Sequence, residues 1–150
     1  MIENLLQFNL DLKHFAKVVV PEEHAKYVKR IALHLYDDIT DGMAGGPGNP
    51  KDTGWSRANW GVKIGKDGVP TEPMGTYPKD RAGSGVAMSR NTYMDVHNIV
   101  SMANLGRSPF LWLYNNAQYI EPLENGHSKQ APQGFVEHAF NNLQLYVDKV

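Results

Sequence analysis

The sequence predicts an α+β domain, in which a small, mainly antiparallel sheet is covered on one face by helices. Two observations lead to this prediction. Three long segments repeat apolar residues at three- and four-residue steps, and two short segments between them have strand character. The 150-residue chain has the usual length of one domain, which we place at residues 1–150. An open sheet of few strands has edges that must be covered or paired, which favours self-association.

The first long helix is predicted from Pro21 to about Thr40. Proline suits a first helical position, and the carboxylates of Glu22 and Glu23 suit the positive end of the helix dipole. Gly42 is placed to end the helix. Its apolar stripe consists of Val28, Ile31, Ala32, Leu35 and Ile39. A separate short helix is predicted before it, over Leu12–Val19.

Two loops rich in glycine and proline enclose the first predicted strand. The first loop is predicted at Met43–Ser56 and the second at Gly65–Gly85. Between them, apolar residues alternate with polar residues or glycine, a period of two that is typical of a half-buried strand. The apolar members of this pattern are Ala58, Trp60, Val62 and Ile64.

The second half of the chain predicts a helix, a strand and a final helix. The second helix runs from about Met88 to Ala103 and is closed by Gly106. Phe110–Tyr114 is short and wholly apolar, so it is interpreted as a central strand with Phe110 and Trp112 in the core. The last helix follows from Phe135, Val136, Ala139, Phe140, Leu143, Tyr146 and Val147.

Composition excludes several functional classes. Fifteen basic residues against sixteen acidic ones give a net charge of −1, which provides no electrostatic footprint for wrapping nucleic acid or an anionic membrane. The absence of cysteine excludes disulfides, thiolate metal sites and thiol catalysis. No signal peptide is recognised, and no segment approaches the roughly 20 apolar residues of a membrane helix. We therefore expect a soluble domain made inside the cell.

The six histidines raise the question of a metal site. None of them stands in HxxxH or HxH spacing, and His34 with Asp37 or Asp38 supplies only two ligands where zinc normally takes three or four. We therefore interpret the histidines as solvated residues on helix surfaces and expect no metal or other cofactor. The set is His14, His24, His34, His97, His127 and His138.

A hydrolase would have to use Ser128, His127 and Glu124. Neighbouring side chains on an irregular segment diverge, and no G-x-S-x-G elbow is present to expose a nucleophile. A carboxylate pair for glycoside cleavage would need Glu124 and a partner such as Asp52 at a defined separation. Glu124, in a glycine-rich turn, more often caps backbone N–H groups. We assign no catalytic residue, and a hydrolase stays as an alternative.

Phosphate binding and DNA binding are two further functions that the sequence could suggest. The glycines at 42–48 follow a helix and include proline, so they do not form a phosphate-binding loop of the G-x-x-x-x-G-K-[ST] type. A DNA-binding accessory protein is a further alternative, because basic residues and aromatics alternate in the middle third and such mixtures bind single strands. The residues concerned are Lys51, Arg57, Lys63, Lys66, Lys79, Arg81 and Arg90, with Trp55, Trp60 and Tyr77. Ordinary loop solvation explains them better, since acidic residues are interleaved and Trp60 lies on the apolar side of its strand.

Two motifs, taken together, resemble a known family. The first runs from Asp52 through Thr53, Gly54 and Arg57 to Trp60; the second begins with Asn115, Asn116 and Tyr119 and continues through Glu124, Gly126, Ser128 and Pro132 to Gly134. These motifs resemble the tailed-phage neck or tail-completion proteins related to the minor tail protein Z of lambda-like phages. The resemblance covers about residues 15–140, and the two long loops depart from the family pattern.

The resemblance implies a virion structural protein without catalysis. A member of this family is expected to form a closed ring, expected to be a hexamer, between the head-side connector or head-closure protein and the tail terminator. DNA would cross the lumen without sequence readout, and the chain would be made in the host cytoplasm and located in the virion.

The resemblance also implies structural roles for the motif residues. We expect Asp52-Thr53-Gly54 to form a turn and Arg57 to pin that turn or pair with Glu124. Tyr119 is expected to anchor its turn onto the sheet or to serve at an interface.

Overall fold

The structure is a computed structural model that describes residues 5–42, 48–49, 55–71, 84–105, 110–129 and 133–147. The two predicted loops, at 43–56 and 65–85, lie partly outside this range. So do the motif residues Asp52, Thr53, Gly54 and Pro132, and the predicted helix-closing Gly106.

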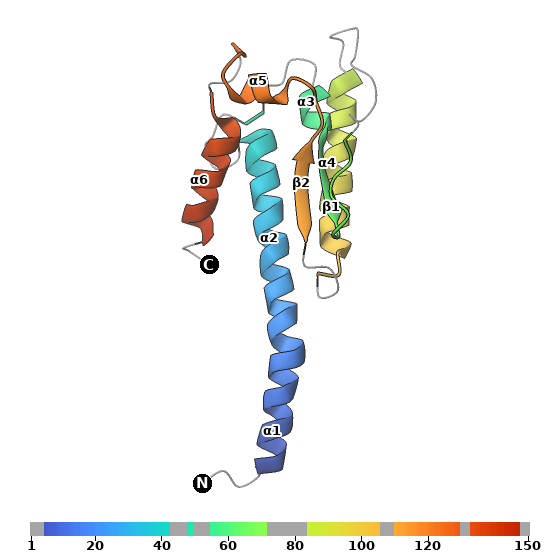
Figure 1. Ribbon diagram of the computed structural model, residues 1–150, viewed down its shortest axis with the longest axis vertical. Helices are drawn as coiled ribbons and strands as arrows, with labels where there is room; N and C mark the ends of the chain where they lie inside the picture. The colour runs from blue at the N-terminus through green and yellow to red at the C-terminus, as the bar shows by residue number, and fades with distance from the viewer. Residues whose placement is uncertain are drawn as a thin grey trace.

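A single long helix forms the first part of the chain (Figure 1). It consists of α1 (Leu5–His14), a π-helical turn η1 (Phe15–Val19) and α2 (Val20–Asp41). The predicted α2 is confirmed. Leu12–Val19 is helical as predicted, but the helix begins earlier, at Leu5, and runs on into α2 without a break. Val19 and Val20 keep helical dihedral angles, and the Val20 N–H bonds to the carbonyl of Phe15, five residues back. This wider turn carries the helix past Pro21, whose ring would clash within a regular α-helix.

The sheet has two antiparallel strands, β1 (Trp60–Ile64) and β2 (Leu111–Asn115). The register pairs Trp60 with Asn115 and Ile64 with Leu111, so alternate residues of the two strands share a face. Trp60 and Val62 lie on the face that packs against helices. Gly61 lies on the other face under the ring of Tyr114, where an added Cβ would come within 2.7 Å of Tyr114 Cζ.

Two longer helices complete the domain, α4 (Ser84–Met102) and α6 (Phe135–Val147). In Figure 1, α6 lies beside α2 on one side, and the sheet with α4 lies on the other. The buried core joins all of these elements and consists of Tyr36, Ile39, Trp60, Val62, Val96, Val100, Phe135 and Ala139. The helices therefore cover one face of a small sheet, and the predicted α+β fold is confirmed.

Two short helices were not expected from the sequence. They are α3 (Trp55–Ala58), directly before β1, and α5 (Ile120–Glu124), directly after β2. Trp55, Ser56 and Ala58 are buried in α3, so Ala58 belongs to a helical turn and not to the strand, as its place in the alternating pattern had suggested. Segments of four or five residues are too short for helical periodicity to be visible in a sequence.

The prediction that Phe110 and Trp112 are core residues is wrong. Phe110 is 44% exposed and Trp112 is 39% exposed. Trp112 pairs with Lys63 on the face of the sheet that the helices do not cover. Its ring stacks on Phe110, and its indole N–H donates to the carbonyl of Gly65 at 2.8 Å. An apolar run in a two-stranded sheet has only one buried face, so alternate residues of the run remain at the surface.

Within the described residues, none of the helices combines the length and apolar character needed to cross a membrane.

Candidate functional site at the junction of the two motifs

The end of α2 is the base of the site. Gly42 adopts the left-handed conformation, with φ of 68°, and its N–H donates to the carbonyl of Asp38 at 2.9 Å. The predicted glycine stop is thus confirmed. The chain then returns to the helix end, where the Asn49 N–H donates to the carbonyl of Ile39 at 2.7 Å. Gly48 is so close to this end that an added Cβ would lie 2.8 Å from the backbone nitrogen of Gly42.

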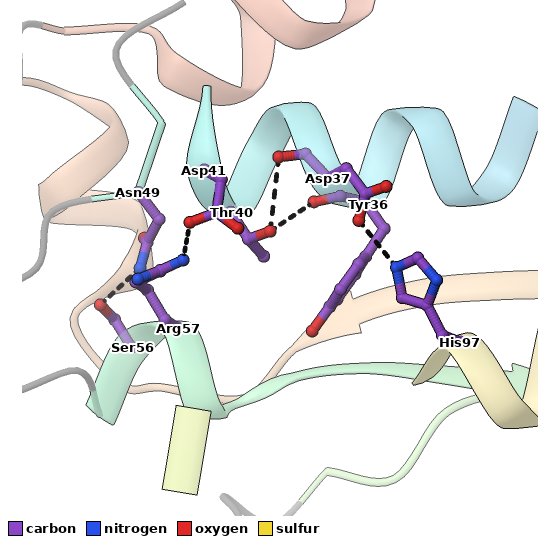
Figure 2. Close-up of polar contacts among 8 residues, drawn as sticks. All are labelled: Tyr36, Asp37, Thr40, Asp41, Asn49, Ser56, Arg57 and His97. Carbon is purple, nitrogen blue, oxygen red and sulfur yellow. Dashed lines mark hydrogen bonds and ion pairs between the residues drawn. The ribbon is translucent and has the colours of Figure 1, made fainter. Parts of the chain in front are cut away.

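Short polar contacts connect this end to α3 (Figure 2). The Asn49 amide donates to the hydroxyl of Ser56 at 2.8 Å, and the Arg57 guanidinium pairs with the Asp41 carboxylate. Both Asn49 and Ser56 are buried, so their hydrogen bond is shielded from water. We expected Arg57 to pair with Glu124, and that prediction is wrong, because Asp41 lies closer in the fold. The alternative role of Arg57 in pinning the turn at 52–54 lies outside the described residues.

The second motif meets the first at this same place. The Asn115 side chain donates to the carbonyl of Ser56 at 2.7 Å and accepts from the N–H of Ala117 at 2.8 Å. Tyr119 lies against Trp55, with ring centroids 5.5 Å apart. Tyr119 was expected to anchor its turn onto the sheet, but the ring that it contacts belongs to Trp55 in α3. The structure therefore brings the two motifs into direct contact.

The Asn116 side chain contacts a different segment from that of Asn115. Its side-chain amide donates to the carbonyl of Pro70 at 2.7 Å, in the segment that follows β1. The two consecutive asparagines thus connect β2 to two different parts of the chain, Asn115 to α3 and Asn116 to the loop after β1.

Glu124 binds the start of α6. One carboxylate oxygen accepts from the N–H of Val136 at 2.9 Å, and the other accepts from the N–H of Glu137 at 3.1 Å. The backbone carbonyl of Glu124 also accepts from the N–H of Gly134 at 2.8 Å. The prediction that Glu124 caps backbone N–H groups is confirmed. A carboxylate suits this position because the first N–H groups of a helix lack partners within the helix and carry partial positive charge.

The glycines of the second motif have backbone roles. Gly126 has φ of 84° and Gly134 has φ of 82°, a region that other residues rarely adopt. Gly126 donates its N–H to the carbonyl of Leu123 at 3.1 Å and so closes the turn after α5. Ser128 is partly buried between these glycines. The segment therefore sets the direction of α6, as the sequence suggested, although Pro132 lies outside the described residues.

A second polar cluster, between α2 and α4, was missed from the sequence (Figure 2). His97 Nε2 lies 2.8 Å from an Asp37 carboxylate oxygen, and the His97 ring packs against Tyr93 with centroids 4.2 Å apart. Tyr36 packs against both rings. Burial raises the pKa of Tyr36, and burial with the neighbouring Asp37 carboxylate raises the pKa of Tyr93. The four-residue spacing of Tyr93 and His97, which places both on one helix face, is the sequence feature that could have indicated this cluster.

The histidines are not all solvated, which corrects the sequence interpretation. His34 packs against Tyr146 with ring centroids 4.1 Å apart, and His97 pairs with Asp37. Both occupy contacts between helices. Within the ranges that the structure describes, no group of three histidine, aspartate or glutamate side chains is arranged to hold a metal ion.

A search against protein-family models found no match for this chain, and neither the curated proteins nor the solved structures gave one. The chemistry of the site therefore follows from the contacts of its own residues.

The contacts of the site residues bear on the two alternative functions, a hydrolase and a DNA-binding protein. Both Glu124 oxygens accept hydrogen bonds from backbone N–H groups at the start of α6. Trp55 and Trp60 are 5% and 6% exposed, and neither ring offers a free face for stacking a base. Asp52, Tyr77 and several of the basic residues named for DNA binding lie outside the described residues.

Proposed function

We propose that this chain is a structural subunit of the neck of a tailed bacteriophage, a tail-completion protein that joins the head connector to the tail. In this role copies of the chain form a closed ring, which we propose to be a hexamer, between the head-closure protein and the tail terminator. DNA passes through the lumen without sequence readout. The protein acts as a scaffold within the virion and carries out no catalysis.

The observation that supports this proposal most directly is the contact between the two motifs. Asn115 binds the backbone of Ser56, and Tyr119 packs on Trp55, so the residues that resemble the family hold one another in place. Glu124 of the second motif caps the start of α6. Side chains whose polar atoms are hydrogen-bonded to the backbone stabilise the fold. They do not converge on a point where a substrate atom could react.

The net charge agrees with the proposed passage of DNA. With a formal charge of −1, the subunit has no strong attraction for the duplex that would retard its movement. A ring also requires a heterologous contact, in which two different surfaces of the same chain meet.

Mass spectrometry of purified phage particles from cells that express this gene tests the proposal. We expect the chain in intact particles at a fixed ratio to the other neck proteins. Deleting the gene should leave DNA-filled heads and separate tails that do not join. Absence of the chain from intact particles, or normal joining without it, would contradict the proposal.

A single substitution separates the scaffold from the hydrolase alternative. His127 is exposed and its side chain is the group that a hydrolase would use beside Glu124. We expect His127→Ala to leave both particle assembly and infectivity unchanged. If lysis of the host or cleavage of a substrate is lost while particles still assemble, the hydrolase is the better description.

A further inference from the structure

The N-terminal part of the long helix extends away from the rest of the molecule (Figure 1). We call residues 10–20 the arm. Among the described elements, α1 and η1 make extensive contacts only with their neighbours along the same helix. The arm nevertheless carries five large apolar side chains that are between 38% and 54% exposed: Leu10, Leu12, Phe15, Val18 and Val20.

This exposure is unfavourable for an isolated chain. Helices in water are stabilised mainly by packing an apolar face against another element, and among the described elements the arm packs extensively only on its neighbours along the same helix. Its composition does not compensate, because Phe15 is aromatic and Val18, Val19 and Val20 are consecutive β-branched residues with low helix propensity. A partner surface that covers these apolar side chains would therefore stabilise the arm.

The body of the same molecule has an apolar groove. It has a volume of about 510 Å³ and opens between α2, β2, α5 and α6. Its apolar lining comes from Leu35, Ile39, Leu113, Ile120, Val136 and Phe140. Phe140 lines this groove and is 55% exposed, although α6 packs on α2. We call this the α5 groove.

The polar groups at the α5 groove do not favour a small polar ligand. The Glu124 carboxylate caps α6, and the Asn115 amide binds Ser56 and Ala117. A small-molecule site normally offers several convergent polar groups that fix the orientation of its ligand. Since these two groups are already engaged, the groove offers mainly apolar contact, which suits the side chains of an amphipathic helix.

The arm cannot reach the groove of its own molecule. The helix is continuous from the arm to Leu35 and Ile39 at the groove, and Phe15 is separated from Leu35 by twenty residues. At 1.5 Å per residue, this places them roughly 30 Å apart along the helix axis. A helix of this kind would have to break for the arm to fold back, so an arm that lies in this groove would come from a second copy.

The charges of the two surfaces are complementary. The arm carries Lys13 and Lys17 against one carboxylate, Asp11. The described lining of the α5 groove includes Glu121 and Glu124 and no basic residue. Attraction between opposite charges accelerates the encounter of two surfaces and helps to fix their orientation.

We propose that the arm of one copy lies in the α5 groove of a second copy, with Leu12 and Phe15 as its anchors. Because arm and groove are different surfaces, each copy can give its arm to one neighbour and accept an arm from another. This contact would generate the ring, so the inference rests on the proposed function for the expectation that copies associate. The contact itself can be tested without phage particles.

Substitutions at two of the exposed phenylalanines, Phe15 and Phe140, test the contact. Phe15→Ser on the arm and Phe140→Ser at the groove should each weaken self-association roughly tenfold or more, measured by analytical ultracentrifugation. Leu145→Ser is the matched control, since Leu145 lies on α6 like Phe140, is 59% exposed and does not line the groove. It should change the dissociation constant by less than about twofold. All three positions are exposed, so circular dichroism should report an unchanged fold.

Cysteine cross-linking identifies the partners, because the chain contains no cysteine of its own. One population carries Ala16→Cys on the arm, and the other carries Glu121→Cys at the groove. On mixing and mild oxidation we expect a disulfide between the two populations, and none when Asp95→Cys on α4 replaces Glu121→Cys. A chain with both Ala16→Cys and Glu121→Cys should give a ladder of linked copies that ends at the ring size.

Several outcomes would overturn the inference. A wild-type chain that stays monomeric excludes the contact, and a dominant disulfide between two Ala16→Cys arms shows that the arms pair with each other. Equal effects of Phe140→Ser and Leu145→Ser would exclude the groove. A ladder that stops at two copies supports the arm-and-groove contact but contradicts a ring. The presence of the chain in virions is decided separately by the particle experiment.

Discussion

Glu124 uses both oxygens of its carboxylate to bind the first turn of α6. The contact spans two elements that are separated by an irregular segment, so one side chain determines where the last helix begins. The positive end of the helix dipole adds to the hydrogen bonds.

Glu124→Ala should therefore destabilise the fold by about 1 kcal/mol, the usual effect of removing a helix cap. Urea denaturation followed by circular dichroism measures it. Asp95→Ala is the control, because Asp95 is exposed on α4, and it should change the free energy of unfolding by less than about 0.5 kcal/mol. Equal effects of the two substitutions would contradict a capping role.

Tyr36 gives the fold a dependence on high pH. Its phenol is buried, and this burial raises the pKa of Tyr36 above the usual value of 10.0. Below pH 10 the phenol is protonated in both the folded and the unfolded chain. Above that pH the unfolded chain releases the proton while the folded chain retains it, so proton release favours unfolding.

We expect the free energy of unfolding to fall as the pH rises above about 10, by up to about 1.4 kcal/mol per pH unit for this group. The raised pKa of Tyr93 acts in the same direction. Chemical denaturation between pH 8 and about pH 11 measures the slope. Tyr36→Phe should make the slope shallower, and an unchanged slope in this variant would exclude the assignment.

The junction between β2 and α3 depends on one asparagine. Asn115 donates to the carbonyl of Ser56 and accepts from the N–H of Ala117, so it connects the end of the sheet to the short helix before β1. These two elements are distant in the sequence, and α3 is itself held to the end of α2 by Asn49 and Arg57.

Asn115→Ala should cost about 1–3 kcal/mol, because it leaves partly buried backbone groups without their partner. Asn116→Ala is the matched control, since this neighbour binds the exposed carbonyl of Pro70, which water can satisfy. We expect the control to cost less than half as much in thermal or urea denaturation. The reverse order would mean that the segment after β1, and not α3, is the important contact.

At the scale of the whole molecule, the described elements form a packed body and a helical arm that extends away from it (Figure 1). Local stability follows packing, so the backbone of the arm should open far more often than the part of the same helix that is buried in the body. Tyr36 and Ile39 in that part are each 1% exposed.

Hydrogen exchange followed by mass spectrometry measures this difference. At low protein concentration, amides at 10–19 should exchange at least about tenfold faster than those at 31–41. Raising the concentration should protect the arm selectively if a second copy covers it. Equal protection of both segments at every concentration would contradict an unsupported arm.

The amino-acid pattern by itself determined the long elements. The three longer helices and both strands follow from apolar spacing, and Gly42 ends α2 where its position predicted. These features are set by contacts between near neighbours in the chain, which repeat at the period of the element. The capping role of Glu124 was also recognisable, because its chemistry is local to a turn.

Only the tertiary structure decided which surfaces are buried and which polar groups meet. The apolar run at Phe110–Tyr114 predicted a fully buried strand, but a two-stranded sheet covered on one face leaves Trp112 exposed. Arg57 pairs with Asp41, and His97 pairs with Asp37, sixty residues away. Such partners depend on how the elements pack, and the pattern along one segment contains no information about the side chains that another segment brings to it.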